Sequence, residues 1–253
     1  MCLMTPADPD VRGAKPRPRH RMVDRVAAIL EMVARAPEGL TLTEISTELG
    51  APVSSTHGLV NGLAATGYLE ERNRVYRLGA APYLLNVIAG RPPVTKVSHD
   101  QLLGVHAETG LTTALSAMVG DSLFYVDHVS SDPVYAYLGE NRLRRSLLRT
   151  SAGWVLLADK ENRDIWTLLN GLPEDDSPRV EAFLGQLEEI RRTGICASPR
   201  AARDGGDGIS VALREDGMTI ATVGVIGDAT TIAPRRDELV EILVRHATEW
   251  GLR

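Results

Sequence analysis

The chain has 253 residues, is 43% hydrophobic and carries a formal net charge of −5. This length and apolar content are enough to bury a full core in one large domain or two smaller ones, which excludes a chain that is disordered throughout. The two cysteines, Cys2 and Cys196, exclude a disulfide framework and show no metal-ligand spacing. No metal or other cofactor is therefore expected.

The charge is spread unevenly, which favours two domains. Residues 1–91 hold 11 Lys/Arg and 9 Asp/Glu, a net charge of +2. Since the whole chain carries −5, residues 92–253 carry −7 and would repel a polyanion. Five basic residues and no acid lie between Arg12 and Arg21: Arg12, Lys15, Arg17, Arg19 and Arg21. Prolines stand where a signal peptide would be apolar, so residues 1–21 are expected to be a disordered basic arm. No apolar run approaches the ~20 residues of a membrane span, so we expect a soluble cytoplasmic protein.

Two helices are expected directly after the arm. Apolar residues recur at helical spacing from Val26 to Val33, and Pro37 ends that run. In the following segment Thr41 and Glu44 have the offset of a capping box, and Gly50 stands just past the end of the second helix. The first helix is amphipathic, and the second is short.

The segment "PVSSTHGLVNGL", residues 52–63, predicts a third helix with Pro52 in its first turn. One face is a stripe suited to packing, formed by Thr56, Leu59, Val60 and Leu63. The opposite face is small and polar: Ser54, Ser55, His57, Gly58, Asn61 and Gly62. Two helices joined by a tight turn are typical of a helix-turn-helix, whose second helix enters the DNA major groove. The alternative is a solvated face with two unfavourable glycines.

A basic hairpin follows the third helix. Strand-like pieces at 68–71 and 75–78 flank Arg72, Asn73 and Arg74, and Asn73 suits a tight turn. With Arg77 nearby, such a hairpin is a wing that can lie along the phosphate backbone.

The run from Arg25 to Gly79 resembles the winged helix-turn-helix of the isocitrate-lyase-regulator (IclR-type) family of bacterial transcription factors. The likeness continues through "AAPYLLNVIA" and then through "LLGVHAETGLTTALSAMVGDSLFYVDHV", "SLLRTSAGWVLLA" and "EEIRRTGICASPRAARDGGDGISVALREDGMTIATVGVIG". It implies a winged helix at 22–79, a connecting helix and linker at 80–93, and an effector-binding domain at 94–253 that cups a pocket on a six-stranded sheet. Family members usually carry basic residues where this chain has Val53 and Gly58, so two DNA contacts are missing.

Without the family, the second part of the chain predicts an α+β domain with a mostly antiparallel sheet flanked by helices. Gly120-Asp121 and Asp216-Gly217 each separate two strand-like runs, and helical stretches lie between these hairpins, the last ending at Gly194. An enzyme is the weaker alternative. His99, His106, His128 and the glycine-rich run 203–208 match no catalytic or phosphate-binding motif.

By resemblance, the effector site includes the amides of Ser151 and Ala152 at a helix N-terminus, which can hold a carboxylate. Its other expected members are Ser198, Gly208, Gly224 and Ile226. Because glycines enlarge a cavity and Gly208, Gly224 and Ile226 offer no thiol or hydroxyl group, we expect an organic acid with an apolar body rather than a small oxygen-rich acid.

The sequence thus predicts a one-component transcriptional regulator that performs no chemistry. Its expected partners are a pseudo-palindromic double-stranded DNA operator, read by Ser54, Ser55, His57 and Asn61 with Arg72, Arg74 and Arg77 on phosphate, and a second copy of the chain, as a dimer or a dimer of dimers. Leu84, Leu85 and Ile88 offer an apolar surface for pairing. The rivals are a ligand-binding or scaffolding protein that has lost DNA binding and, with less support, a metabolite-processing enzyme.

Overall fold

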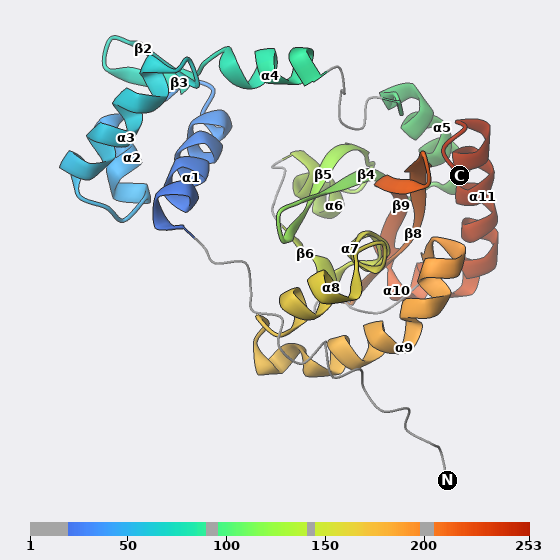
Figure 1. Ribbon diagram of the computed structural model, residues 1–253. Coiled ribbons are helices and arrows are strands. Elements are labelled where there is room, and N and C mark those ends of the chain that lie inside the picture. The colour runs from blue at the N-terminus through green and yellow to red at the C-terminus, as the bar shows by residue number, and fades with distance from the viewer. Residues whose placement is uncertain (1–19, 90–95, 141–144, 198–204) are drawn as a thin grey trace. The chain divides into compact units, whose positions relative to one another are not determined.

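A computed structural model describes residues 20–89, 96–140, 145–197 and 205–253. The chain divides into two compact units, one within residues 17–92 and the other within residues 93–253 (Figure 1). Residues 1–19 of the expected basic arm lie outside the described residues. The arm was expected to extend to residue 21, but Arg21 is already the first residue of a helix.

The first unit is a three-helix bundle with a small sheet. In chain order its elements are α1 (Arg21–Arg35), β1 (Leu40–Thr41), α2 (Leu42–Glu48), α3 (Val53–Ala65), β2 (Leu69–Arg72), β3 (Val75–Leu78) and α4 (Ala81–Ala89). The predicted capping box is present, since the Thr41 side chain accepts from the Glu44 amide and Glu44 accepts from the Thr41 amide. Gly50 follows α2 with φ +61°, as its place beyond the helix end predicted.

Three details of this unit differ from the predictions. Pro52 is the N-cap of α3 rather than a residue of its first turn. Strand β2 begins and ends one residue later than predicted, so Arg72 lies in the strand and only Asn73 and Arg74 form the turn, with φ of 54° and 63°. Both values are positive, as a tight hairpin turn requires. Strand β1, which pairs with β3, was not predicted; because it is only two residues long, it has no periodicity to detect.

The second unit is α+β, as predicted. Its helices are α5 (His99–Thr109), α6 (Pro133–Glu140), α7 (Ser151–Ala158), α8 (Asn162–Leu169), α9 (Ser177–Thr193), α10 (Ala229–Ile232) and α11 (Arg236–Glu249). Its strands are β4 (Thr112–Val119), β5 (Ser122–Val129), β6 (Arg145–Ser146), β7 (Ile195–Ala197), β8 (Gly206–Glu215) and β9 (Met218–Asp228). Both predicted hairpin turns are present, and Gly194 ends α9 in the left-handed conformation.

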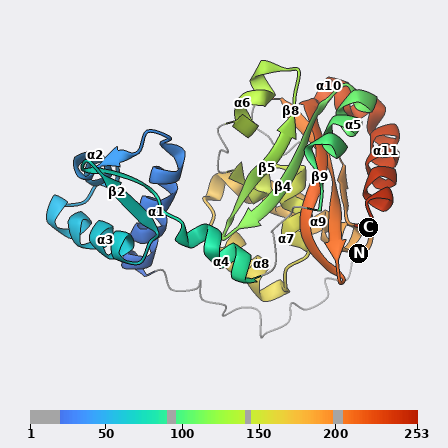
Figure 2. The ribbon, with the colours of Figure 1, turned by 90° about the horizontal axis from the view of Figure 1, so that it is seen from above.

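The strands form one antiparallel sheet of six, in the order β6-β5-β4-β9-β8-β7. Side chains alternate between its two faces. Leu115, Val211 and Val223 pack with α5 and α11 on one face, whereas Ala114, Leu123 and Ala212 pack with α7 and α9 on the other (Figure 2). With helices on both faces, the central strands are apolar on both sides.

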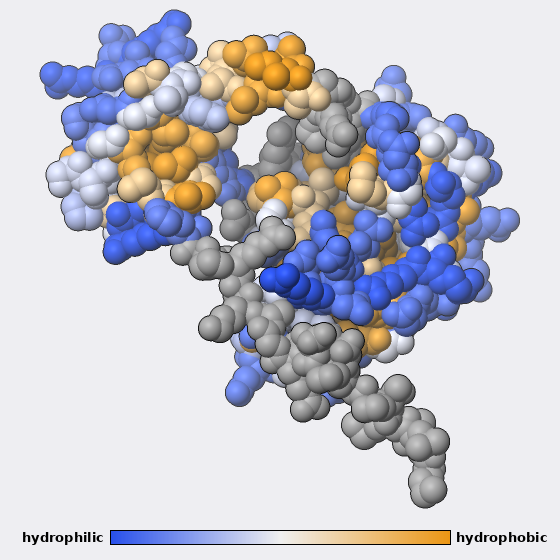
Figure 3. Space-filling model, in the orientation of Figure 1, coloured by the Kyte–Doolittle hydropathy of each residue, from blue (hydrophilic) through white to orange (hydrophobic). Residues whose placement is uncertain are grey.

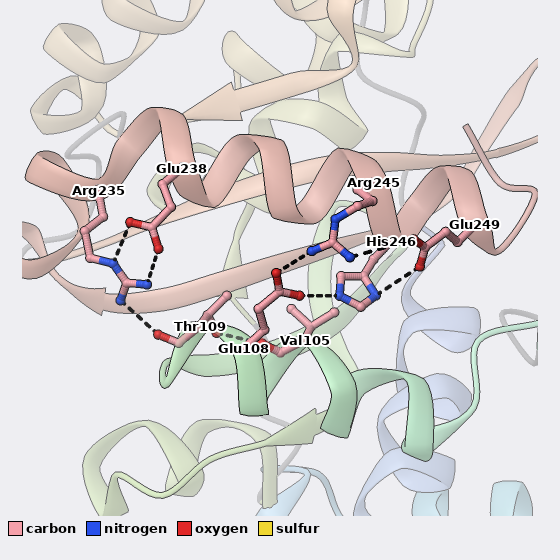
Figure 4. A network of polar contacts seen from close by, with 8 residues as sticks. All are labelled: Val105, Glu108, Thr109, Arg235, Glu238, Arg245, His246 and Glu249. Carbon is pink, nitrogen blue, oxygen red and sulfur yellow. Dashed lines mark hydrogen bonds and ion pairs between the residues drawn. The ribbon is translucent and has the colours of Figure 1, made fainter.

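Helices α5 and α11 are joined by a polar network (Figure 4). The Glu108 carboxylate accepts hydrogen bonds from Arg245 and, at 3.0 Å, from His246. Arg235, the N-cap residue of α11, donates to Glu238 of that helix and to the carbonyl of Thr109 at 2.9 Å. These contacts hold α11 against α5 on the outer face of the sheet.

Candidate functional site

The polar face of α3 is exposed, as predicted. Thr56, Val60 and Leu63 are buried in the bundle. Ser54, Ser55, His57 and Asn61 are all exposed on the opposite side. Asn61 Nδ2 lies 3.2 Å from the His57 Nε2 atom one turn earlier, and Ser55 Oγ donates to the Pro52 carbonyl. A Cβ built on Gly58 or Gly62 would meet nothing within 4 Å, so packing within the chain does not require either glycine.

The three wing arginines are exposed but differ in their neighbours. Arg72 pairs with Glu70 at 2.5 Å, and Arg77 lies 3.9 Å from a carboxylate oxygen of Glu38. No ion pair joins Arg74, at the hairpin tip, to another described residue. Its positive charge is therefore the one most available to a phosphate.

A cavity of about 200 Å³ lies within the second unit, between the sheet and the N-terminus of α7. Pairing across the sheet places Ser116 beside Tyr125, Ala114 beside Gly224, and Gly224 beside Ser210. These residues and the Gly208–Ile226 pair alternate onto the α7 side of their strands and form the floor of the cavity. The walls come from Val134, Tyr135, Arg145, Arg149, Thr150, Ser151, Ala152, Gly206 and Asp207.

Five of the six predicted effector residues therefore line one cavity: Ser151, Ala152, Gly208, Gly224 and Ile226. Ser198 lies outside the described residues. Thr150 caps α7, its side chain accepting from the Gly153 amide at 3.0 Å. The amides of Ser151 and Ala152, at the first two helical positions, lie beyond the reach of the helix's own carbonyls. They are donors at the positive end of a helix, suited to an anion.

The expectation that both glycines enlarge the cavity for a ligand was wrong for Gly224. A Cβ on Gly224 would come within 2.5 Å of Ser210 Oγ, so this glycine makes room for a hydroxyl rather than for a ligand. Ser210 Oγ lies 2.9 Å from Ser151 Oγ. The cavity floor consequently carries a hydroxyl group, Ser210 Oγ, that the expected site lacked.

The sequence interpretation missed several polar lining residues: Ser116, Tyr125, Arg145, Arg149, Asp207 and Ser210. Burial raises the pKa of Tyr125, while the nearby positive charge of Arg145 opposes that shift. Ser116 and Ser210 are buried hydroxyl residues that each stand between two apolar residues of a strand, which is the signal that could have identified them.

Two of the histidines that were weighed as catalytic candidates, His99 and His106, hold elements together in this structure. His99 pairs with Asp127 at 3.1 Å and so links α5 to β5. His106 Nδ1 donates to the Leu111 carbonyl, and its Nε2 lies 2.9 Å from Ser131 Oγ. Among the described residues, no group of three or more His, Cys, Asp and Glu side chains could hold a metal ion. In that same part of the chain, no helix is both long and apolar enough to cross a membrane.

Two family models match the chain: the IclR helix-turn-helix domain at residues 22–73, and the bacterial transcriptional regulator IclR C-terminal domain at residues 88–250. HTH-type transcriptional regulator TtgV of Pseudomonas putida is 24% identical over 183 residues, covering 70% of each chain. HTH-type transcriptional regulator XynR of Escherichia coli is 26% identical over 183 residues, covering 68% of this chain and 71% of the relative.

Solved structures share the fold. An IclR homologue from Microbacterium hydrocarbonoxydans, complexed with 4-hydroxybenzoate, superposes with a TM-score of 0.67 at 22% identity, over 90% of this chain and 97% of the other. A regulator from Alicyclobacillus acidocaldarius superposes with a TM-score of 0.66 at 18% identity, over 92% and 98% of the two chains.

Proposed function

Since the chain belongs to the IclR family of bacterial transcriptional regulators, with a DNA-binding helix-turn-helix and a C-terminal effector-binding domain, we propose that a small organic acid with an apolar body sets its affinity for an operator. The observation that carries this proposal is the cavity between α7 and the sheet. Free helix amides at Ser151 and Ala152 lie at one side of it, and Ala114 and Ile226 belong to its floor.

The cavity's size fits a ligand with a single ring. A cavity of roughly 150 Å³ is large enough to hold benzene, and this one measures about 200 Å³. The carboxylate binds the amides of Ser151 and Ala152, and the apolar body lies toward Ile226. The Microbacterium relative complexed with 4-hydroxybenzoate, an aromatic acid, supports this class of effector.

Operator binding is assigned to α3 and the wing, and the active species to a dimer. Base edges contact Ser54, Ser55, His57 and Asn61, and phosphates contact the wing arginines. One recognition helix covers only a few base pairs, so a pseudo-palindromic site read by two copies is proposed. As a regulator of the chromosome, the protein works in the cytoplasm, and we assign no reaction to it.

Helix α4 supports pairing between two copies. None of its residues is buried in its own unit. Tyr83 is 73% exposed and Ile88 71% exposed, and Leu84, Leu85 and Val87 are exposed beside them. Figure 3 shows the apolar surface that these side chains give α4. A surface of this kind is typical of an interface.

A thermal-shift panel tests the effector class. A ligand that binds only the folded state raises the melting temperature by an amount that grows with the logarithm of its excess over the dissociation constant. Aromatic and branched aliphatic acids, 4-hydroxybenzoate among them, are expected to raise it more than glyoxylate or pyruvate at equal concentration. The reverse ranking contradicts the proposal.

A further inference from the structure

Arg149 lines the cavity next to the amides that are to hold the effector. It ends the short 3₁₀ turn Leu147–Arg149, and only Thr150 separates it from the start of α7. Its Nη2 atom donates to Asp176 Oδ1 at 2.6 Å, and Asp176 is only 3% exposed. Within the described residues, the Nη1 atom of Arg149 is buried and has no hydrogen-bond partner.

Asp176 accepts only part of the hydrogen-bonding capacity of the Arg149 guanidinium. The same carboxylate oxygen also accepts from Arg179 Nη1 at 3.1 Å, so two arginines share it. A guanidinium has five N–H donors in a planar fork that matches a carboxylate. A buried N–H group without a partner is costly, and because Arg149 lines the cavity, a turn of its guanidinium would bring that group to the carboxylate of a bound acid.

From this arrangement we propose that Arg149 is the specificity-determining residue of the cavity. Its guanidinium binds the effector's carboxylate together with the amides of Ser151 and Ala152. The cavity therefore selects acids over uncharged molecules of the same shape. This inference rests on the effector-binding role proposed above. It adds that Arg149 recognises the negative charge of the effector.

Arg145, the other arginine of the wall, is placed differently. It belongs to β6 at one edge of the sheet, opposite Leu123 of β5, and its charge acts on Tyr125. Ser151 contacts Ser210 of β8, four strands away in the sheet order. The charge of Arg145 is therefore assigned to the part of the cavity beside Tyr125 rather than to the amides of α7.

The test compares acids with their amides. Dissociation constants of benzoate, 4-hydroxybenzoate, benzamide and 4-hydroxybenzamide are measured by calorimetry on the full-length protein. The wild type is expected to prefer each acid to its amide. Arg149→Gln is expected to weaken both acids about tenfold or more and to leave the amides unchanged. Arg149→Lys keeps the positive charge but not the planar fork of donors, so its affinity for the acids is expected to lie between those of the wild type and Arg149→Gln.

Arg179→Gln serves as the matched control, because it removes the other donor to Asp176 and Arg179 does not line the cavity. It is expected to keep the preference for acids. An unchanged preference in Arg149→Gln, or an equal loss in Arg179→Gln, overturns the proposal. If Arg149→Gln does not fold, an undiminished preference in Arg149→Lys overturns it as well.

Wild-type binding distinguishes this failure from failure of the proposed effector class. If the wild type binds none of the acids tested here or in the thermal-shift panel, the effector class is wrong, and the role of Arg149 is wrong with it. If the wild type prefers acids and Arg149→Gln does too, only the role of Arg149 is wrong.

Discussion

Asn61 and Arg74 represent the two kinds of DNA contact that the first unit offers. Asn61 is exposed on α3 and can form two hydrogen bonds with adenine, worth about 1–3 kcal/mol of discrimination. Arg74 stands at the wing tip and is the wing arginine without an ion pair among the described residues. A phosphate contact strengthens binding to every sequence alike.

Asn61→Ala is therefore expected to relax the preference for the operator sequence. Arg74→Ala is expected to weaken binding to every DNA sequence and to lower the slope of log affinity against log salt concentration by about one. Binding of each variant to operator and random DNA is measured over a range of salt concentrations. The assignment fails if both variants reduce the affinity for operator DNA and for random DNA by the same factors.

Gly58 tests whether the small-residue face approaches DNA closely. Because a Cβ there meets no atom within 4 Å, Gly58→Ala is expected to stabilise the fold by about 1 kcal/mol. The added methyl group is expected to weaken operator binding. Gly185, inside α9, is equally open and gives the matched control. Chemical unfolding and DNA titration of both variants check this.

Gly185→Ala should gain similar stability and leave DNA binding unchanged. Operator binding that is unaffected in Gly58→Ala would mean that the solvated-face interpretation of α3 was correct.

At the scale of elements, the sequence predicted best where a single chemical signal marks a boundary. Thr41 with Glu44 marked the start of α2, and Gly194 marked the end of α9, because a cap is a local hydrogen-bonding requirement. The cavity floor was predicted less well. Strands covered on both faces lose the polar-apolar alternation that tells one face from the other, so the sequence did not show which residues face the cavity.

The site residues divide in the same way. Ser151 and Ala152 were expected from the resemblance to the family, and their place at a helix N-terminus gives them free donors. Arg149 was missed, since a basic residue between elements is usually on the surface. Its burial depends on Asp176, 27 positions later, and such a pairing has no local signal.

The Glu108 network makes the packing of α5 on α11 sensitive to acid. Hydrogen bonds from Arg245 and then His246 hold the pKa of Glu108 below its ordinary value of 4.5. A lowered carboxyl pKa stabilises the fold above the unfolded-state pKa, and that stability is lost as pH falls through the folded-state pKa. Glu108→Gln is therefore expected to be less stable than the wild type at neutral pH and equal to it in strong acid.

Urea unfolding between pH 7 and pH 3 measures this difference. Glu249→Gln is the control, because Glu249 contacts Arg245 and His246 from their own helix and does not bridge to α5. A difference in the free energy of unfolding between wild type and Glu108→Gln that does not change with pH would contradict the account.

At the scale of the whole molecule, the exposed apolar face of α4 predicts pairing of two copies. Leu84→Ser with Ile88→Ser is expected to give a monomer that binds the operator weakly, because two half-sites roughly one helical turn apart need two copies. Light scattering and a DNA titration check this. Val119→Ser, at an exposed position in the second unit, is the control. A wild-type monomer with intact operator binding would contradict the prediction.

The central claim is that an acid bound in the second unit changes DNA binding by the first. The most direct measurement is the dissociation constant of the full-length protein for labelled DNA from upstream of its own gene, with and without a saturating aromatic acid. The account predicts specific binding that the acid shifts by about 5–150-fold in either direction, and no such shift with pyruvate. Specific binding that no acid of the panel alters, although the acid occupies the cavity, would contradict it.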